Sequence, residues 1–282
     1  MIGLALALAL SQPLPPPSND DITVIGRKAV ESATVQQFVD SISVPTGPQI
    51  ARFHIPICPV ALGLPDDAAR FVEERIRETA RGVGALVAGK RPCEANLLFI
   101  AVENCDAFLK ELRRERRDWL DGVSAYEVRA MLASPPPVRA WSITSLCNED
   151  GLSQGTSQAS ASGSHFQSMP TLRVMSASIL KLPTRVDVEG SIVLIDRSAL
   201  AGLSLAQVAD YVAMRGLART REPASGRVDS ILSLFRTDGG ERPAELSGAD
   251  IVYLQSLYRS GGTASAAVEK GRMARDIKRS AR

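Results

Sequence analysis

The sequence predicts an α+β fold in which helices pack against a mixed β-sheet. Residues 96–102 (NLLFIAV) and 191–196 (SIVLID) are apolar runs of β-strand length, which is typical of strands covered on both faces. Residues 64–82 and 205–215 carry apolar side chains at helical spacing between recognisable helix ends. Together these segments predict helices layered on a central sheet.

Composition excludes several classes of function. The 282 residues are enough to bury a substantial core, and 33 Lys and Arg nearly balance 31 Asp and Glu. Without a strong net charge, the chain has no global field that would attract nucleic acid. Only 5% of residues are aromatic and two are His, which leaves little material for base stacking or an all-histidine metal site. We therefore expect no nucleic-acid partner and no cofactor.

The first 20 residues look like a secretory signal followed by a proline-rich spacer. Residues 2–10 form an unbroken apolar run, and residues 13–18 are rich in proline. The run is shorter than the ~20 apolar residues that a membrane-spanning helix needs, so we expect no transmembrane span. Export would make the protein periplasmic or secreted. Because no Lys or Arg precedes the run, an apolar N-terminus on a cytosolic protein is the alternative.

The cysteines fit an oxidising compartment. None forms a C-x-x-C pair and the spacing matches no structural zinc pattern, so disulfide bonding is the better interpretation in an exported chain. Cys58 and Cys93 lie beside prolines on either side of the 64–82 helix, and we expect them to be bonded. Cys105 and Cys147 form either a second bridge or two buried thiols.

The N-terminal half of the chain, 21–150, alternates helices and strands. After the 96–102 strand, a charged amphipathic helix is expected over 106–120. Its outer face carries Arg113, Arg114, Arg116 and Arg117. Acidic residues interleave with these arginines, which favours a solvated face over a site for phosphate or anionic lipid.

A short helix and a strand complete this half. Ser124 and Glu127 form a capping-box pair, so a helix is expected as far as Ala133, where three prolines end it. A strand is expected over 138–146. Residues 151–168 are dominated by Ser, Gly, Gln and Ala, and this composition predicts a mobile loop between strands.

The C-terminal half, 169–260, begins with strands, expected over 172–182 and 191–196. Helices follow. Ser204 and Gln207 form a capping box for the 205–215 helix, and Gly216 is its expected stop.

A last pair of helical segments ends the sequence. Ser247 is the expected cap of a helix over 247–258. The basic tail, 261–282, mixes Ala with Lys and Arg and is expected to be a frayed or detached helix.

Four segments of the C-terminal half occur in a distinctive order. SIVLID at 191–196 leads into ADYVAMRG at 209–216, DSILS follows at 229–233, and LSGADIVYLQSLY follows at 246–258. This order resembles the catalytic half of zincin metalloproteases, especially the metzincin type. In that family a strand leads into a helix with H-E-x-x-H-x-x-G-x-x-H, followed by a methionine-containing turn and a final helix. The resemblance implies a zincin-like mixed sheet with packed helices.

The metal-ligand positions of that family hold no metal donors here. With Gly216 aligned on the family glycine, Ala209, Ala213 and Arg219 occupy the three ligand positions and Asp210 the general-base position. Two methyl groups and a guanidinium cannot bind zinc, so the resemblance implies no metal and no zinc peptidase activity.

The resemblance also implies a place for each of these residues. Ala209 and Ala213 should share one helix face at the floor of a cleft, which is either left as a pocket or packed shut. We expect Asp210 to be a solvated or hydrogen-bonded carboxylate, with Arg219 neutralising it or facing a substrate carboxylate.

Three functions compete. The leading hypothesis is a non-catalytic, zincin-like protein of the cell envelope that binds a peptide or protein partner in the remnant cleft. A non-metal hydrolase using Ser153 or Asp210 is one alternative. Ser153 lies in a G-x-S-x-G match at 151–155, but the flanking residues form no strand-turn-helix, and His165 lies in the same loop. The other alternative is a structural envelope component that docks on anionic lipid or polymer through basic surfaces.

Overall fold

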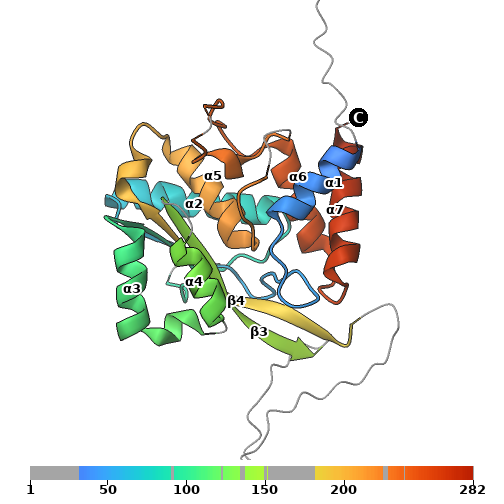
Figure 1. Cartoon of the computed structure of the whole chain (residues 1–282), viewed down its shortest axis with the longest axis horizontal. Coiled ribbons are helices and arrows are strands. Elements are labelled where there is room, and N and C mark those ends of the chain that lie inside the picture. Colours follow the sequence, from blue (N-terminus) through green and yellow to red (C-terminus); the bar gives the residue numbers. More distant parts are fainter. Residues whose placement is uncertain are drawn as a thin grey trace, which may run out of the picture.

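The computed structural model describes residues 32–89, 92–121, 123–133, 137–148, 151, 182–224, 228–237 and 239–281. These residues form seven α-helices and a four-stranded mixed sheet (Figure 1), so the α+β prediction is confirmed. The signal-like segment with its proline-rich spacer, residues 152–168 of the expected loop, which include Ser153 and His165, and residues 172–181 of the expected 172–182 strand lie outside the described residues.

One sheet joins both halves of the chain. Strands β1 (Pro59–Leu62), β2 (Leu97–Val102) and β4 (Thr184–Asp196) run parallel, and β3 (Val138–Asn148) pairs antiparallel with β4. The strand order is β1-β2-β4-β3, which leaves β1 and β3 at the edges. Strand β4 is longer than the predicted 191–196 segment because its polar first residues pair with the end of β3.

The two faces of the sheet are covered by different helices. Phe99 and Val193 face the larger core, which α2 (Asp66–Gly82) and α5 (Leu205–Leu217) help to form. Their neighbours along the strands, such as Leu194, face a smaller core under α3 (Cys105–Glu115). Because both faces are buried there, β2 and residues 192–195 of β4 are apolar throughout.

Capping predicted the helix starts well. The Ser204 hydroxyl accepts from the Gln207 N–H at the start of α5. The Ser247 hydroxyl accepts from the Asp250 N–H at the start of α6 (Gly248–Arg259). The Ser124 hydroxyl accepts from the Glu127 N–H at the start of α4 (Ala125–Ala133). Local side-chain chemistry fixes these starts, so they can be recognised without knowledge of the tertiary structure.

Two helix ends differ from the predictions. Gly216 does not stop α5, which continues through Leu217 because the glycine is used for close packing against β2. The 106–120 helix is divided: α3 ends at Glu115, and a 3-10 turn, η1 (Arg117–Leu120), follows.

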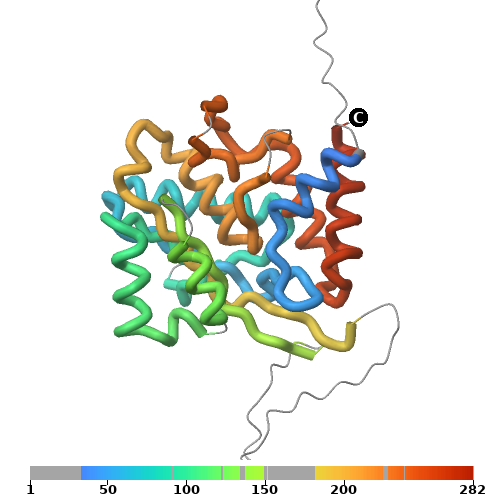
Figure 2. Tube along the Cα trace, viewed as in Figure 1, coloured from blue at the N-terminus to red at the C-terminus, as the bar shows by residue number. Residues whose placement is uncertain are grey.

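The C-terminal tail is not a frayed or detached helix. Helix α7 (Ala266–Ser280) packs against α6 and against α1 (Ser32–Ile42), which is not among the sequence predictions (Figure 2). Its Met273 and Ile277 side chains are buried in the larger core. Of the basic residues that suggested a free tail, Arg275 and Arg279 are exposed on the outer side of this amphipathic helix, and Lys270 pairs with Asp40 of α1 at 3.4 Å.

Candidate functional site

Helix α5 carries two of the predicted metal-ligand positions into the core. Ala209 and Ala213 are both 0% exposed, so the floor expected beside them is packed shut. The helix lies against β2, β4 and the edge strand β3 on one side and against α2 on another. No ligand could reach either methyl group without opening this packing.

A short turn closes over α5 and is fastened to α6. The 3-10 turn η3 (Ile231–Ser233) contacts α5, and the Tyr211 and Phe235 rings meet edge to face with centroids 4.8 Å apart. The Asp250 carboxylate accepts from the Ser230 hydroxyl at 2.6 Å and from the Ile231 N–H at 2.8 Å. Burial raises the pKa of Asp250 even though these hydrogen bonds lower it. The segment expected as the zincin-type turn is therefore fixed structurally by this aspartate.

Asp210 is hydrogen-bonded, as expected, and its partner comes from α2. Arg75 donates from Nε to Oδ1 at 2.6 Å and from Nη2 to Oδ2 at 2.8 Å, and the Leu246 N–H donates to Oδ2 at 3.0 Å. The Asp210 side chain is 2% exposed and that of Arg75 30%. This bidentate interaction raises the pKa of the Arg75 guanidinium. The carboxylate thus joins α2, α5 and the segment before α6.

Arg219 does not neutralise Asp210, so the first of its two expected roles is wrong. Because α5 runs to Leu217, Arg219 leaves the far end of the helix, about two and a half turns beyond Asp210. It donates to Glu127 of α4 at 2.6 Å and also bonds the Thr46 hydroxyl. Burial raises the pKa of Glu127, but the Ser124 hydrogen bonds and Arg219 lower it more, and the net direction is downward.

A hollow of about 300 Å³ lies beside Asp210, between α2, α5 and the start of α6. Its apolar lining includes Val83, Leu246 and Ile251, and its charged lining includes Arg75, Glu78 and Glu245. The exposed fraction of Ile251 is 37%, so an aliphatic side chain is available at the mouth of the hollow. Among the predicted site residues that the structure describes, Asp210 alone borders this space.

The sequence did not reveal the other lining residues of the hollow. Arg75 occupies an ordinary position on an amphipathic helix, and no local pattern shows that its partner lies 135 residues further on. Ile251 belongs to the 246–258 segment, which predicts a final helix through the resemblance but no lining residue.

The predicted disulfide is present. Cys58 and Cys93 are bonded, with their Cα atoms 6.1 Å apart. Cys105 and Cys147 are free and buried, which decides the open alternative in favour of two buried thiols. Burial raises the pKa of both thiols, so neither is a reactive nucleophile.

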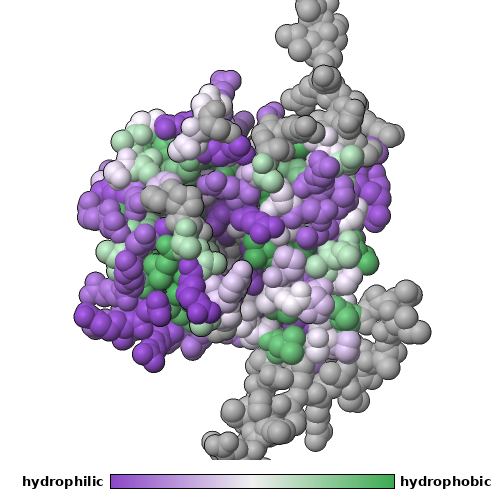
Figure 3. All heavy atoms as spheres, viewed as in Figure 1, coloured by the Kyte–Doolittle hydropathy of each residue, from purple (hydrophilic) through white to green (hydrophobic). Residues whose placement is uncertain are grey.

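Two of the four arginines between Arg113 and Arg117 pair with acidic neighbours. Arg114 lies 3.0 Å from Glu115, and Arg116 lies 2.8 Å from Asp118. Hydrophilic side chains gather over α3 in Figure 3. This arrangement favours the solvated face that the interleaved charges predict.

The described residues contain no group of three or more His, Cys, Asp or Glu placed to hold a metal ion. No helix among them is long and apolar enough to cross a membrane. A scan of protein-family models finds no match to the chain, and searches of curated proteins and of solved structures find none either.

Proposed function

We propose that the protein is a non-catalytic, exported binding protein of zincin-like fold that takes up an apolar peptide side chain in the hollow beside Asp210. The engagement of the Asp210 carboxylate by Arg75 and Leu246 carries this proposal. Because of these hydrogen bonds, the residue at the general-base position of the resemblance holds α2, α5 and the segment before α6 together at the edge of the proposed binding surface.

A general base needs a free lone pair and access to the proton that it removes. Both Asp210 oxygens already accept guanidinium hydrogen bonds, one of them also accepts a backbone N–H, and the side chain is 2% exposed. These contacts argue against the hydrolase alternative that relies on Asp210.

The order of elements supports the zincin-like part of the proposal. Strand β4 is followed, after a 3-10 turn, by α5, then by η3, which contacts α5, and then by α6, in the order that the sequence resemblance implies. The mixed sheet with an antiparallel edge strand is compatible with the same resemblance. The Cys58–Cys93 bond supports export, because disulfides persist in oxidising compartments.

The lining of the hollow indicates the chemistry of the ligand. A volume of about 300 Å³ lies at the small end for ligand sites, which suits a side chain better than a whole cofactor. Val83, Leu246 and Ile251 offer contact to an aliphatic group, while Glu78 and Glu245 place negative charge around it. We infer that the preferred peptide carries an aliphatic residue next to Lys or Arg.

Selection from a random peptide library on the purified chain tests this proposal. We expect enriched peptides to share an aliphatic residue beside a basic one. Ile251→Arg should weaken their binding, measured by fluorescence anisotropy, by about tenfold or more because it fills the mouth with a charge. Val268→Arg is the matched control, since Val268 is 54% exposed on α7, outside the lining of the hollow.

The control variant should bind like the wild-type chain. Equal binding by the Ile251→Arg and wild-type chains would place the ligand elsewhere. Cleavage of the selected peptides, followed by mass spectrometry, would contradict the non-catalytic part of the proposal.

A further inference from the structure

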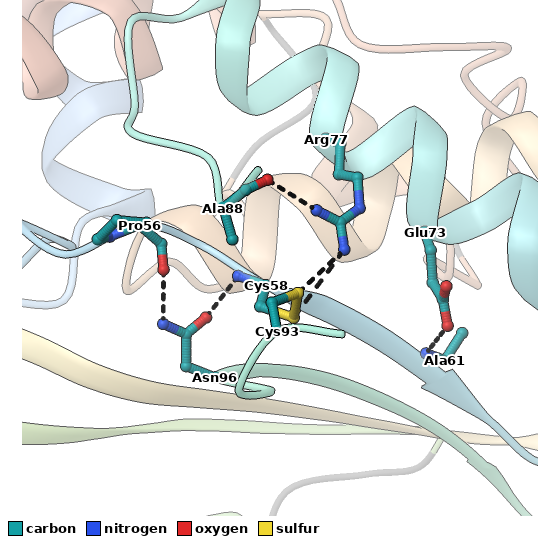
Figure 4. The surroundings of a disulfide bond; sticks show 8 residues. All are labelled: Pro56, Cys58, Ala61, Glu73, Arg77, Ala88, Cys93 and Asn96. Atoms are coloured by element: carbon teal, nitrogen blue, oxygen red, sulfur yellow. Dashed lines mark hydrogen bonds between the residues drawn. A yellow bond between two sulfur atoms is a disulfide. The ribbon is translucent and has the colours of Figure 1, made fainter. Parts of the chain in front are cut away.

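We propose that the Cys58–Cys93 disulfide is a site of thiol–disulfide exchange, where a protein dithiol reduces the bond and the buried Arg77 guanidinium stabilises the departing thiolate. This proposal is independent of the hollow beside Asp210. It concerns the start of β1, which Cys58 immediately precedes and where α2 passes over the two sulfur atoms (Figure 4).

Arg77 of α2 points onto the disulfide. Its Nη2 lies 3.5 Å from Cys93 Sγ and 3.9 Å from Cys58 Sγ, and its Nη1 donates to the Ala88 carbonyl at 3.3 Å (Figure 4). Arg77 is 4% exposed. Among the described residues, no carboxylate lies within ion-pair distance of Arg77, and the Glu73 carboxylate, one turn earlier, accepts from the Ala61 N–H at 3.0 Å.

A buried guanidinium without a carboxylate favours any reaction that places negative charge beside it. Disulfide sulfur atoms are neutral and accept hydrogen bonds only weakly, so the intact disulfide is a poor partner for the charged guanidinium of Arg77. Reduction changes this, because a cysteine next to arginine is stabilised as its thiolate. Breaking the bond therefore supplies a negative charge next to Arg77.

The surrounding backbone holds the site together without the disulfide. The Cys58 N–H donates to Asn96 Oδ1 at 2.8 Å, and the Asn96 N–H donates to the Cys58 carbonyl at 3.1 Å. Ile57 exchanges two backbone hydrogen bonds with the segment after α2, donating to Leu86 and accepting from Ala88, both at 2.9 Å. Cys58 and Arg77 should consequently remain in contact after reduction.

Exposure selects the sulfur that is attacked. Cys58 is 2% exposed, whereas Cys93 is partly exposed. A thiolate of the incoming dithiol attacks Cys93 Sγ, the Cys58–Cys93 bond breaks, and its electron pair remains on Cys58 Sγ beside Arg77. The second thiolate of the dithiol then attacks the dithiol's other sulfur atom, which is bonded to Cys93 Sγ in the mixed disulfide, and Cys93 is released. The dithiol is oxidised to a disulfide, two electrons reach this chain, and Cys93 takes up a proton.

The wild-type chain provides the first test. After reduction, one thiol should titrate, by ultraviolet thiolate absorbance, with a pKa clearly below the ordinary value of about 8.5. Cys105 and Cys147 do not interfere, because burial raises their pKa values. A reduced chain in which every thiol titrates at or above the ordinary value would overturn the proposal.

Variants at Arg77 provide the second test, with dithiothreitol as the reductant. Arg77→Gln should slow reduction about tenfold and shift the equilibrium with dithiothreitol by a similar factor, or about 30 mV. Arg77→Lys retains the charge and should restore part of the rate. Arg81→Gln is the matched control: Arg81 lies one turn further along α2, 53% exposed and paired with Glu74, and its loss should change nothing.

The direction of the Arg77→Gln effect separates the two possible roles of this side chain. If Arg77 only fills space, loosened packing will leave the reduction rate unchanged or increase it, and either result contradicts the proposal. Should Arg77→Gln fail to fold, the wild-type titration and the Arg77→Lys rate still decide the question.

Discussion

Gly216 of α5 lies directly against Leu97 of β2. A Cβ atom at position 216 would come within 3.0 Å of the Cγ and Cδ1 atoms of Leu97, which is itself 0% exposed. The glycine therefore lets α5 approach the sheet closely, and this approach sets the position of Asp210, about 1.7 turns earlier on the helix.

Gly216→Ala should lower the free energy of unfolding by about 1 kcal/mol. Alanine improves helix propensity by about 1 kcal/mol, but the new methyl group has to displace a fully buried leucine, and overpacking costs about 1–3 kcal/mol. Gly271→Ala in α7 is the control, because its Cβ would meet no atom closer than 3.9 Å. Urea denaturation should show the control variant to be more stable than the wild type; equal gains in both variants would contradict this contact.

Met273→Ala should lower the free energy of unfolding by about 2–5 kcal/mol, because Met273 of α7 is 1% exposed and packs in the larger core. Val268→Ala, on the same helix but 54% exposed, should change it by less than about 0.5 kcal/mol. Thermal or chemical unfolding of the two variants compares them directly. Equal, negligible effects would mean that α7 is a detached tail after all.

Arg75→Met should be more damaging than Asp210→Asn at neutral pH. Removing the guanidinium leaves an almost fully buried carboxylate with one backbone donor, at a cost of about 3 kcal/mol. Asparagine at 210 keeps an acceptor for the Leu246 N–H, while Arg75 can still reach water, so we expect a loss of about 1 kcal/mol. A double-mutant cycle should give a coupling free energy of about 0.5–3 kcal/mol. A coupling of zero would remove the structural role assigned to Asp210.

Asp187→Asn should make the protein less sensitive to acid. Burial raises the pKa of Asp187, but its contacts with His54, at 2.8 Å, and Arg185, at 3.0 Å, lower the pKa by more than burial raises it. The net pKa of Asp187 is therefore below the ordinary value. A lowered carboxyl pKa stabilises the fold above the unfolded-state pKa of about 4, and this contribution is lost as the pH falls through the folded-state pKa.

The difference in unfolding free energy between wild type and Asp187→Asn should thus be largest near neutral pH and shrink below about pH 4. Asp67→Asn is the control, since the Asp67 side chain is 93% exposed. A difference between wild type and Asp187→Asn that does not vary with pH would show that the carboxylate charge contributes nothing.

Features that depend on neighbouring residues were predictable from the sequence. The capping serines Ser204 and Ser247 act within one turn, and the continuous apolar runs of β2 and β4 report burial on both faces. The Cys58–Cys93 bond followed from prolines and compartment.

Features that depend on distant partners were not predictable. A glycine near a helix end is usually a stop, but Gly216 is used for packing on a strand far away in the sequence. The polar start of β4 becomes a strand only because β3 pairs with it. Asp210 was identified, but its partner Arg75 and the neighbouring Ile251 were not, since nothing local marks a tertiary contact.

Amide hydrogen exchange of the full chain, with and without a library-selected peptide, tests the central claim most directly. We predict slower exchange at residues 79–83 of the α2 end and at residues 246–251 where α6 begins, because these segments line the hollow. The peptide should remain intact throughout. Protection confined to other segments, or hydrolysis of the peptide, would contradict the assignment of the hollow beside Asp210 as a non-catalytic binding site.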